Sequence, residues 1–425
     1  MIPRLLIGAV ILLGAIDSAR AEVRCGVSRP IKQEVERSTA NIDTAKFLNH
    51  VRDSFRERFK GYAVILTGSQ GRRLGFRREG WAIDPCEPST SGVRFDLNTE
   101  SAIGSVTKLF TTVAVLKATT DSPASHLQRP LTHFLPFRWR NMAHSFYDTV
   151  TIEELLQHKG GFFKSGGGKH VSERLAGGRE RSLGDYRRQP RFYSNSSMGI
   201  FHFIYARYGF RSTNFLNPKS LHDVEVEHQN SNNATYNAEV QKVTSAAFNH
   251  GLYRHILKPL AISATCDARV SRFPASNAIK SPPNAPIVHF PFHNVARSYA
   301  SATDSRGALL ASSMQNCAAG GLYMSAKDLA AFVFALGDLS FLSKADRDRM
   351  MNGGPVNNLY AFGTISAEGG RAFWHNGKRT EGGNSSYAVV LRFASGASAV
   401  FVTNSDNDGT NTLNTIRDAY NLARQ

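Results

Sequence analysis

The sequence predicts an α+β protein in which one antiparallel sheet, built from both ends of the chain and flanked by helices, carries an inserted and mostly helical lobe. Three observations lead to this fold class. Strand-like runs follow a helical pattern near the start of the chain, further strand-like runs precede a helical pattern near its end, and helical patterns dominate between them. Of the 425 residues, 41% are hydrophobic and 20% are charged, which is typical of a globular protein with a large core.

The first predicted helix begins at Asp43 or Thr44, either of which can cap a helix. Apolar side chains then recur on one helical face, and Gly61 is expected to end the helix. These side chains are Phe47, Leu48, Val51, Phe55 and Phe59. Residues 62–67 (YAVILT) form a β-rich run, the turn signal GSQG follows, and residues 75–83 predict a second strand.

The end of the chain shows a similar succession of elements. Residues 360–366, 387–393 and 397–403 predict strands with turn residues between them, and residues 412–424 predict a final helix. We therefore expect both chain ends to contribute strands to the same sheet.

The chain is expected to divide into two lobes of one domain. The α/β lobe comprises residues of about 40–100 and 350–425, and the helical lobe comprises residues of about 101–345. Residues 213–310 are rich in Asn, Ser and Pro, and predict long surface loops around one helix near residues 246–260.

The first residues have the pattern of a secretory signal peptide. Arg4 supplies a positive charge, residues 5–16 form a short apolar run, and Ala19-Arg20-Ala21 fits a small-x-small cleavage site. Cleavage after Ala21 would leave residues 22–425 as an exported domain, periplasmic or secreted from a bacterium. The apolar run is too short to span a bilayer comfortably, and no later segment is apolar enough to cross one, so we expect a soluble mature protein.

All four cysteines lie beyond the expected cleavage site, where an oxidising compartment permits two disulfides. Three connectivities are possible. We expect Cys25–Cys86 and Cys266–Cys317, because each pair is closer in sequence than the alternatives. A four-cysteine zinc site would need closely spaced cysteine pairs, which the sequence lacks, so we expect no metal.

Lys and Arg number 51 against 34 Asp and Glu, which gives a formal charge of +17. In a cytosolic protein this balance would indicate nucleic acid, but the predicted export argues against that partner. The acidic partners outside a bacterial cytoplasm are cell-wall polymers and membrane surfaces. We favour the simpler interpretation that the charge keeps the surface soluble without a specific polyanionic partner.

Residues 103–110 (IGSVTKLF) place Ser105 and Lys108 three positions apart in a run that is otherwise apolar or small. On a helix the two side chains share a face. A serine becomes a nucleophile when a base takes its proton, and a lysine can be that base when burial or a nearby positive charge lowers its pKa. The alternative is a structural helix start, in which Ser105 caps the helix and Lys108 extends outward to solvent.

The longer stretch SAIGSVTKLFTTVAVL resembles the nucleophile helix of the class C β-lactamase family, which also contains D-alanyl-D-alanine carboxypeptidases, D-aminopeptidases and secreted esterases. The second element of that family, Tyr-x-Asn, is similar to Tyr193-Ser194-Asn195, and the third, Lys-Thr-Gly or His-x-Gly, is similar to His375-Asn376-Gly377. Three further segments resemble the family in the same order: TIEELLQHKGGFF from Thr151, RHILKPLAISATC from Arg254 and AAGGLYMSAKDLAAF from Ala318. The resemblance spans residues 43–420 and implies the β-lactamase/transpeptidase-like fold.

The resemblance implies a role for each residue of the first two motifs. Ser105 would attack an acyl carbon and form an acyl-enzyme. Lys108 and Tyr193 would share the task of general base. Asn195 would hydrogen-bond Lys108 and the substrate amide.

The third motif would supply the oxyanion hole. The backbone N–H groups of Ser105 and Lys378 would form it on the edge strand of the sheet. Gly377 would let a substrate backbone approach closely, and His375 would supply a hydrogen bond and, when protonated, positive charge near the tyrosine. This family chemistry uses neither a metal nor an organic cofactor.

Structural readings of single residues stay open beside the catalytic ones. Tyr193 would then be a core aromatic, and His375 a structural residue of its strand. We interpret His158 as structural, because it stands at an expected helix end before Gly160, where an imidazole can bond the last carbonyls. Residues 164–169 (KSGGGK) lack the spacing of a phosphate-binding loop and predict a flexible loop.

Two features bear on the substrate. The third motif is His-Asn-Gly rather than Lys-Thr-Gly, a version frequent in the family's esterases and peptidases, so a β-lactam is the less expected substrate. Lys378 and Arg379 follow this motif directly, and five arginines precede Tyr193: Arg179, Arg181, Arg187, Arg188 and Arg191. Facing the active site, they would attract a carboxylate-bearing acyl donor; a solvated basic face is the alternative.

We therefore predict an exported serine hydrolase of the carboxypeptidase or esterase type, resembling penicillin-binding proteins. It would act through a Ser105 acyl-enzyme on an amide or ester, with a D-amino-acid peptide of the cell wall or a small ester as substrate. A class C β-lactamase is the alternative within the family, and a catalytically inactive cell-wall-binding protein is the alternative of another class. The intact set of Ser105, Lys108 and Tyr193 argues against the inactive protein, because a binding module does not need all three. We expect a monomer without a nucleic-acid partner.

Overall fold

The structure is a computed structural model, and it describes residues 30–39, 41–87, 92–119, 126–162, 171–176, 193–207, 220–266, 295–310, 317–352, 362–405 and 409–424. Some of the sequence-based predictions fall on other residues. Outside the described residues lie the signal peptide of residues 1–21, Cys25, the loop at 164–169 and the five arginines from Arg179 to Arg191.

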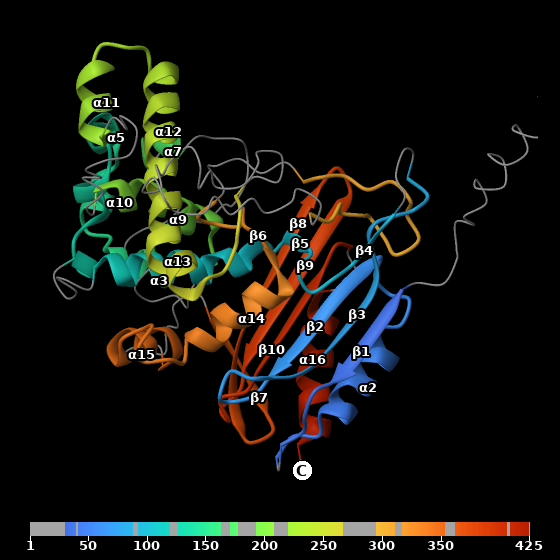
Figure 1. The fold of residues 1–425 in the computed structure, drawn as a ribbon. Helices are drawn as coiled ribbons and strands as arrows, with labels where there is room; N and C mark the ends of the chain where they lie inside the picture. The colour runs from blue at the N-terminus through green and yellow to red at the C-terminus, as the bar shows by residue number, and fades with distance from the viewer. Residues whose placement is uncertain are drawn as a thin grey trace, which may run out of the picture.

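Within the described residues, eight strands form one antiparallel sheet that combines both ends of the chain (Figure 1). Its order is β1-β3-β2-β10-β9-β8-β7, and β4 pairs with β3. The strands are β1 (Ile31–Val35), β2 (Gly61–Thr67), β3 (Arg73–Ile83), β4 (Val93–Arg94), β7 (Gly363–Ala367), β8 (Gly370–Glu381), β9 (Asn384–Arg392) and β10 (Ser398–Thr403). At its centre β2 pairs with β10, which places Tyr62 opposite Thr403 and confirms the predicted sheet from both chain ends.

Two helices cover one face of this sheet, α2 (Thr44–Phe55) and α16 (Gly409–Ala423) (Figure 1). Asp43 caps α2, because its carboxylate accepts the backbone N–H of Lys46 at 3.0 Å. The predicted apolar face of α2 is buried against the sheet. This layer forms one of the two main cores of the protein.

Several element boundaries differ from the predictions. α2 ends at Phe55 rather than continuing to Gly61, since Glu57 takes a left-handed conformation (φ 60°) that a helix does not contain. β7 runs over residues 363–367 instead of 360–366. β1 was not predicted, because it is an edge strand whose apolar ends are exposed and which therefore lacks an alternating buried pattern.

The other face of the sheet carries the predicted helical lobe, which contacts the strands through α14 (Ala326–Ala335) (Figure 1). At the centre of the lobe is α3 (Thr107–Ala118), buried from Thr107 to Leu116. A short two-stranded sheet pairs β5 (Glu100–Ala102) with β6 (Tyr323–Ser325). The remaining elements are η1 (Gly104–Val106), η2 (Leu131–Phe134), α5 (Phe137–Met142), η3 (Ser145–Asp148), α6 (Ile152–Leu156), α7 (Val171–Ala176), α9 (Asn195–Gly199), α10 (Phe201–Arg207), α11 (Leu221–Glu227), α12 (Asn233–Leu252), the π-helical turn η4 (Tyr253–Leu257), α13 (Lys258–Leu260) and α15 (Lys344–Asn352).

The prediction of long surface loops over residues 213–310 is wrong for residues 220–266, which are largely helical. α12 begins at Asn233, well before the predicted start near 246, and Asn232 caps it by accepting the N–H of Thr235 at 2.9 Å. The buried face of α12 contains polar as well as apolar side chains, so its hydrophobic periodicity is weak in the sequence.

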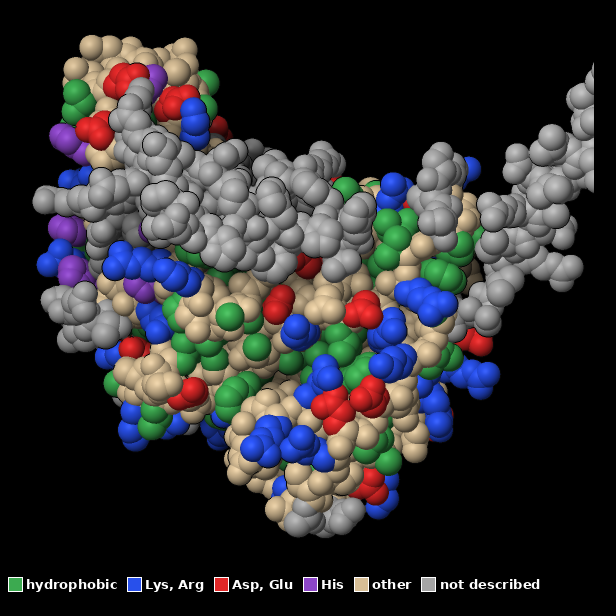
Figure 2. Space-filling model, viewed as in Figure 1, with side chains coloured by type: hydrophobic (Ala, Val, Ile, Leu, Met, Phe, Trp, Pro, Cys, Tyr) green, Lys and Arg blue, Asp and Glu red, His purple; other side chains and the backbone are tan. Residues whose placement is uncertain are grey.

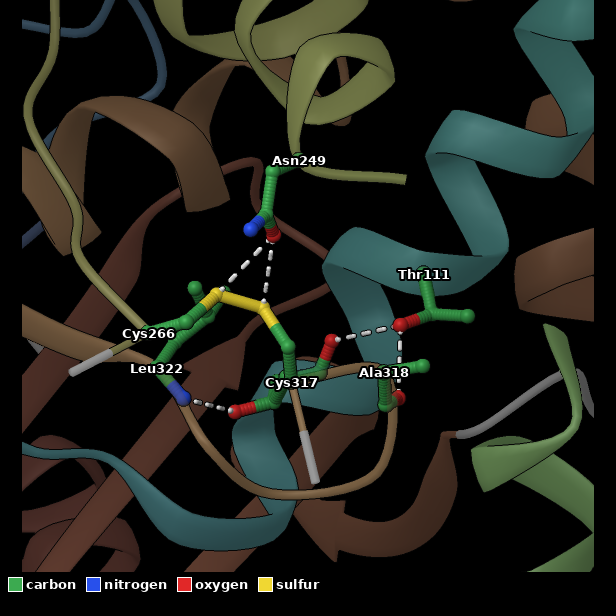
Figure 3. The surroundings of a disulfide bond; sticks show 7 residues. Thr111, Asn249, Cys266, Cys317, Ala318 and Leu322 are labelled. Carbon is green, nitrogen blue, oxygen red and sulfur yellow. Dashed lines mark hydrogen bonds between the residues drawn. A yellow bond between two sulfur atoms is a disulfide. The ribbon is translucent and has the colours of Figure 1, made fainter. Parts of the chain in front are cut away.

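A disulfide joins Cys266 to Cys317 inside the helical lobe, as predicted (Figure 3). It spans 51 residues of sequence, for which the chain-entropy estimate is a stabilisation of about 4 kcal/mol. The side-chain oxygen of Asn249 in α12 lies 3.3 Å and 3.2 Å from the two sulfur atoms. The other predicted pair includes Cys25, outside the described residues, and its expected partner Cys86 is disulfide-bonded.

On the face shown in Figure 2, Lys and Arg side chains are spread over the described surface and lie among Asp and Glu side chains. A mixed surface of this kind agrees with a solubilising role for the net charge. Among the described helices, none has the combination of length and hydropathy needed to cross a bilayer.

Candidate active site

Ser105 and Lys108 are in direct contact at the start of the buried helix α3. Lys108 Nζ lies 2.9 Å from Ser105 Oγ. Ser105 belongs to the 3₁₀ turn η1 and Lys108 to the first turn of α3, so the spacing brings both side chains to one face as predicted. The structural alternative is wrong: the capping positions are Ile103 and Val106, and Lys108 is 0% exposed rather than extended to solvent.

The amine of Lys108 is held in a dry environment. Besides Ser105, it contacts the carbonyl oxygen of Ala319 at 2.5 Å. Loss of hydration on burial lowers the pKa of Lys108 from 10.5 to about 7. At neutral pH a substantial fraction of Lys108 is therefore unprotonated and able to accept the proton of Ser105, which an exposed lysine could not do.

The carbonyl that contacts Lys108 belongs to a segment, residues 318–322, that is hydrogen-bonded to α3. Thr111 Oγ1 donates to the carbonyl of Ala318 at 2.7 Å, and the N–H of Leu322 donates to Thr107 Oγ1 at 3.3 Å (Figure 3). The internal disulfide precedes this segment immediately and ties it to the end of the α12–α13 region (Figure 3). Sequence reasoning missed Ala319, because a backbone carbonyl leaves no signal in the residue type.

Tyr193 lies beside the same amine. Lys108 Nζ is 4.9 Å from the centre of the Tyr193 ring, a distance at which the ring attracts an ammonium group. Tyr193 is 44% exposed, so the interpretation as a core aromatic is wrong. The next residue, Ser194, caps α9 by accepting the N–H of Ser197 at 3.3 Å, and this cap fixes the turn that presents the tyrosine.

Two histidine rings flank Tyr193. The ring of His375 lies 6.5 Å from the tyrosine ring, centre to centre. The ring of His158 lies closer, at 4.7 Å, and is stacked with an angle of 29° between the planes. His158, interpreted from the sequence as structural, thus stands in the site itself; the only sequence signal was its place in the segment TIEELLQHKGGFF.

The predicted hydrogen bond between Asn195 and Lys108 is not formed among the described residues. Lys108 contacts Ser105 and Ala319, whereas Asn195 is exposed at the first position of α9. The acceptor supplied by Ala319 replaces the predicted amide oxygen. Asn195 remains near the site through its neighbour Tyr193, and its substrate contact stays a prediction.

The third motif alternates between the two faces of β8. His375 and Gly377 pair with Val390 and Ala388 of β9, whose side chains pack into the core of the helical lobe. Arg379 follows on the same face by the period of two residues. The ring of His375 is buried, and its Nδ1 donates to the carbonyl of Asn376 at 2.6 Å.

Asn376 and Lys378 occupy the opposite face of β8. Asn376 donates to the hydroxyl of Tyr387 at 2.9 Å, and Lys378 pairs across the strands with the same tyrosine, which packs under α2 and α16. The side chain of Asn376 therefore does not take the place of the threonine hydroxyl in a Lys-Thr-Gly motif. Lys378 can contribute to the site through its backbone N–H, while its side chain points to the other layer.

The two segments that are predicted to form the oxyanion hole lie in close contact. A methyl group added at Gly377 would lie 2.0 Å from the carbonyl oxygen of Ile103 and 2.5 Å from the backbone nitrogen of Ser105. One added at Gly104 (φ 52°) would lie 2.7 Å from the backbone nitrogen of Lys378. Only glycine fits at both positions, and the two predicted N–H donors belong to segments in van der Waals contact.

The description of β8 as the edge strand needs correction. β7 is the terminal strand of the sheet on this side. Its pairing with β8 stops at Trp374, opposite Gly363, so the half of β8 from His375 to Glu381 extends beyond β7. That half pairs with β9 on one side and meets η1 with its open side, which is the position that the oxyanion hole requires.

Replacing Gly377 by alanine is expected to lower kcat/KM by about 10²-fold or more, because the new methyl group forces η1 and β8 apart. Steady-state kinetics on an ester substrate measure the loss. Gly199→Ala is the matched control, since a Cβ at Gly199 meets no atom within 4 Å, and it should keep its activity. Full activity of Gly377→Ala would contradict the assignment of these two segments.

The site thus combines a serine, a buried lysine, a partly exposed tyrosine and a strand whose glycine packs tightly against η1. They come from η1, from the first turn of α3, from the turn before α9 and from β8. Among the described residues, no group of three or more His, Cys, Asp and Glu side chains is arranged to hold a metal ion. An antiparallel sheet between two helical layers with this set of groups defines a protein with the β-lactamase/transpeptidase-like fold.

Comparison with known proteins agrees with this assignment of the fold. The sequence matches the Beta-lactamase family over residues 56–421, and the chain belongs to that family. Proteins with this fold are typically serine hydrolases. No curated protein sequence matches the chain.

Solved structures share the fold at low sequence identity. A class C beta-lactamase from Rhodobacter sphaeroides has a TM-score of 0.57 at 14% identity, with 89% of this chain and 98% of that chain covered. A beta-lactamase/D-alanine carboxypeptidase from Pseudomonas syringae has a TM-score of 0.58 at 14% identity, with 89% and 98% covered. FmtA from Staphylococcus aureus has a TM-score of 0.56 at 16% identity, with 92% and 93% covered. These likenesses establish the fold.

Proposed function

We propose that this protein is an exported serine hydrolase that cleaves an amide or ester through an acyl-enzyme on Ser105. The observation that carries the proposal is the 2.9 Å contact between Ser105 Oγ and the fully buried amine of Lys108. A buried lysine without a role is costly, because burial removes the hydration of its charge. A buried lysine with a lowered pKa in contact with a serine hydroxyl is typical of a catalytic base.

Acylation begins with the transfer of the Ser105 proton to unprotonated Lys108. Ser105 Oγ then forms a bond to the acyl carbon, and the carbonyl oxygen takes the negative charge. Tyr193, beside the same amine, shares the proton with Lys108 and passes it to the leaving amine or alcohol as its bond to the acyl carbon breaks. Water, deprotonated by the same pair, then forms a bond to the acyl carbon of the ester on Ser105. The bond from that carbon to Ser105 Oγ breaks, Oγ takes back the proton from the pair, and the carboxylic acid leaves the free enzyme.

The negative charge on the acyl oxygen is stabilised by the backbone N–H groups of Ser105 and Lys378. The close contact of η1 and β8 supports this role, because it holds both donors rigidly before the substrate arrives. His375 is buried on the face of β8 that carries Gly377, and its ring centre lies 6.5 Å from that of Tyr193. It places a polar ring next to the tyrosine.

For the substrate we propose a D-amino-acid peptide of the cell wall, or a small ester. The His-Asn-Gly form of the third motif supports this choice over a β-lactam. The fold likeness to the Pseudomonas syringae β-lactamase/D-alanine carboxypeptidase is compatible with either substrate class. The alternative is a class C β-lactamase. The dry lysine in contact with Ser105 disfavours the catalytically inactive cell-wall-binding protein.

The proposed export has support besides the pattern of residues 1–21. The Cys266–Cys317 disulfide is of a kind that forms and persists in oxidising compartments. We propose a periplasmic or secreted location, and a monomer that needs neither a metal nor an organic cofactor for this reaction.

Intact-mass spectrometry of the mature protein tests the proposal. The protein is incubated with a fluorophosphonate and, separately, with a penicillin, and peptide mapping locates any adduct. A fluorophosphonate adduct on Ser105 is the expected result, and the absence of any adduct would overturn the hydrolase proposal in favour of the inactive protein. A persistent penicilloyl adduct would indicate a penicillin-binding peptidase, penicillin turnover without an adduct a β-lactamase, and an inert penicillin an esterase or peptidase.

Arg379 is expected to select acyl donors that carry a carboxylate. It lies on the Gly377 face of β8 and its guanidinium is 5.9 Å from the ring of Tyr323. Arg379→Ala should raise KM for an anionic peptide by about tenfold relative to KM for a neutral ester, because a charge-assisted hydrogen bond is lost. Arg371→Ala, on an exposed part of the same strand, is the control.

Lys378 gives the complementary comparison. Its side chain points to the opposite layer, so Lys378→Ala should change the ratio of the two KM values less than Arg379→Ala does. Equal effects of Arg379→Ala on the anionic and the neutral substrate would contradict the carboxylate preference.

A further inference from the structure

His158 contacts the tyrosine turn at two points. Its ring stacks on the ring of Tyr193, with 4.7 Å between the centres. Its Nδ1 accepts the backbone N–H of Ser194, the next residue, at 3.2 Å. Because a ring nitrogen that accepts a hydrogen bond carries no proton, this imidazole is neutral with its hydrogen on Nε2. One side chain therefore holds both the ring and the backbone of the turn.

The backbone of His158 adopts a conformation that is uncommon for residues other than glycine. Its φ of 59° lies in the left-handed region, where a residue with a side chain is less stable than glycine. The backbone by itself would thus favour glycine at this position. A strained residue that is 2% exposed and stacked on a reactive group points to a function of its side chain.

Tyr193 needs such a support. Nearly half of its surface is exposed, so packing against a core does not fix its side chain. It must nevertheless stay beside Lys108, whose amine lies 4.9 Å from the ring centre. The stacked imidazole and the hydrogen bond to Ser194 restrain the ring and the backbone from which it extends.

We propose that His158 is a positioning residue that holds Tyr193 beside Lys108 for the acylation step. The inference rests on the function proposed above, in which Tyr193 and Lys108 share the proton of Ser105. Without the stacked ring, the phenol would turn toward solvent, and a displacement of about 1 Å lowers a reaction rate by about 10²-fold. The loss falls on kcat rather than on KM, because His158 acts on the base and not on the bound substrate.

Two variants separate the two contacts of His158. His158→Asn tolerates the left-handed backbone and keeps an acceptor for Ser194, but it removes the ring. His158→Phe keeps a ring and removes the acceptor. We expect kcat to fall about 10²-fold in His158→Asn with KM changed by less than about threefold, and to recover in part, to a loss of about tenfold, in His158→Phe. His228→Asn, at the end of α11, is the control and should keep kcat.

Fluorine NMR gives a readout that does not depend on activity. The chain has 13 tyrosines, which are labelled as fluorotyrosine, and Tyr193→Phe identifies the resonance of Tyr193 by its loss. The stacked imidazole shifts this resonance through its ring current. We therefore expect the resonance to move in His158→Asn and to stay in place in His228→Asn. Thermal unfolding of each variant confirms that the fold is intact.

The outcomes separate this proposal from the proposed function. A Tyr193 resonance that does not move in His158→Asn, or a kcat of wild-type size in that variant, overturns the positioning role. Equal losses in His158→Asn and His158→Phe that follow a lower melting temperature also overturn it, because they indicate a structural role. If the fluorophosphonate fails to label wild-type Ser105 while the resonance moves as expected, the hydrolase function fails and the positioning contact stands.

Discussion

Ser105→Ala is expected to lower kcat by at least about 10⁴-fold and to abolish covalent labelling by a fluorophosphonate, because it removes the atom proposed to form the acyl-enzyme. Its free energy of unfolding should change little, since Ser105 is partly exposed and caps no helix. Ester hydrolysis and intact mass measure the two effects on the same preparation.

Ser101→Ala is the matched control for this loss. Ser101 is also a serine near the start of the lobe, but it is buried in β5 and its hydroxyl donates to the carbonyl of Thr403 at 3.2 Å. It should retain both labelling and turnover, with some loss of stability for the buried hydrogen bond. Labelling that persists in Ser105→Ala would show that another residue is the nucleophile.

Lys108→Met is expected to lower kcat/KM by about 10²–10⁴-fold, the range typical for loss of a general base. In the wild type, the proposed base would be active when Lys108 is unprotonated, and burial lowers the pKa of Lys108 to about 7. The acylation rate should therefore rise as the pH passes upward through about 7. This rise should be absent from the residual activity of Lys108→Met.

Lys117→Met is the control on the same helix. Lys117 stands in the last turn of α3, where its amine contacts the carbonyl of Phe341 and not the serine. It should keep the activity and the pH profile of the wild type. A pH profile that is unchanged in Lys108→Met would contradict the role of Lys108 as the base.

The same lysine makes stability depend on pH. Between pH of about 7 and 10.5, the unfolded chain binds a proton at Lys108 that the folded protein does not bind. The free energy of unfolding of the wild type therefore rises with pH across this window. Burial of Lys108 destabilises the folded protein most below pH of about 7, where the unfolded chain is protonated. We expect Lys108→Met to have the larger free energy of unfolding at pH 7, because it lacks the buried amine. Since one pKa unit corresponds to about 1.4 kcal/mol, the gap in free energy of unfolding between the variant and the wild type should shrink by several kcal/mol from pH 7 to 10.5. Urea unfolding at several pH values measures it.

Local patterns predicted the parts of the fold that depend on neighbouring residues. The apolar spacing around Phe47 and the cap at Asp43 predicted α2, and the β-rich runs predicted the strands of the central sheet. Patterns failed where the buried face is polar, as in α12, and where an element lies at an edge with exposed apolar residues, as in β1. Packing against the lobe defines α12, and pairing with β3 defines β1; neither is visible in the residue types of the element itself.

The sequence by itself determined the serine and lysine one helical turn apart, the order of the three motifs and the glycine that the third motif requires. Those features depend on the period of a helix and on the small size of glycine, which are local properties. Only the tertiary structure decided that the amine of Lys108 is buried and that Ala319 rather than Asn195 is its second polar contact. It also decided that His158 stacks on Tyr193. These properties arise from the packing of distant segments against α3 and β8, and neither burial nor the position of a backbone carbonyl is written in the spacing of neighbouring residues.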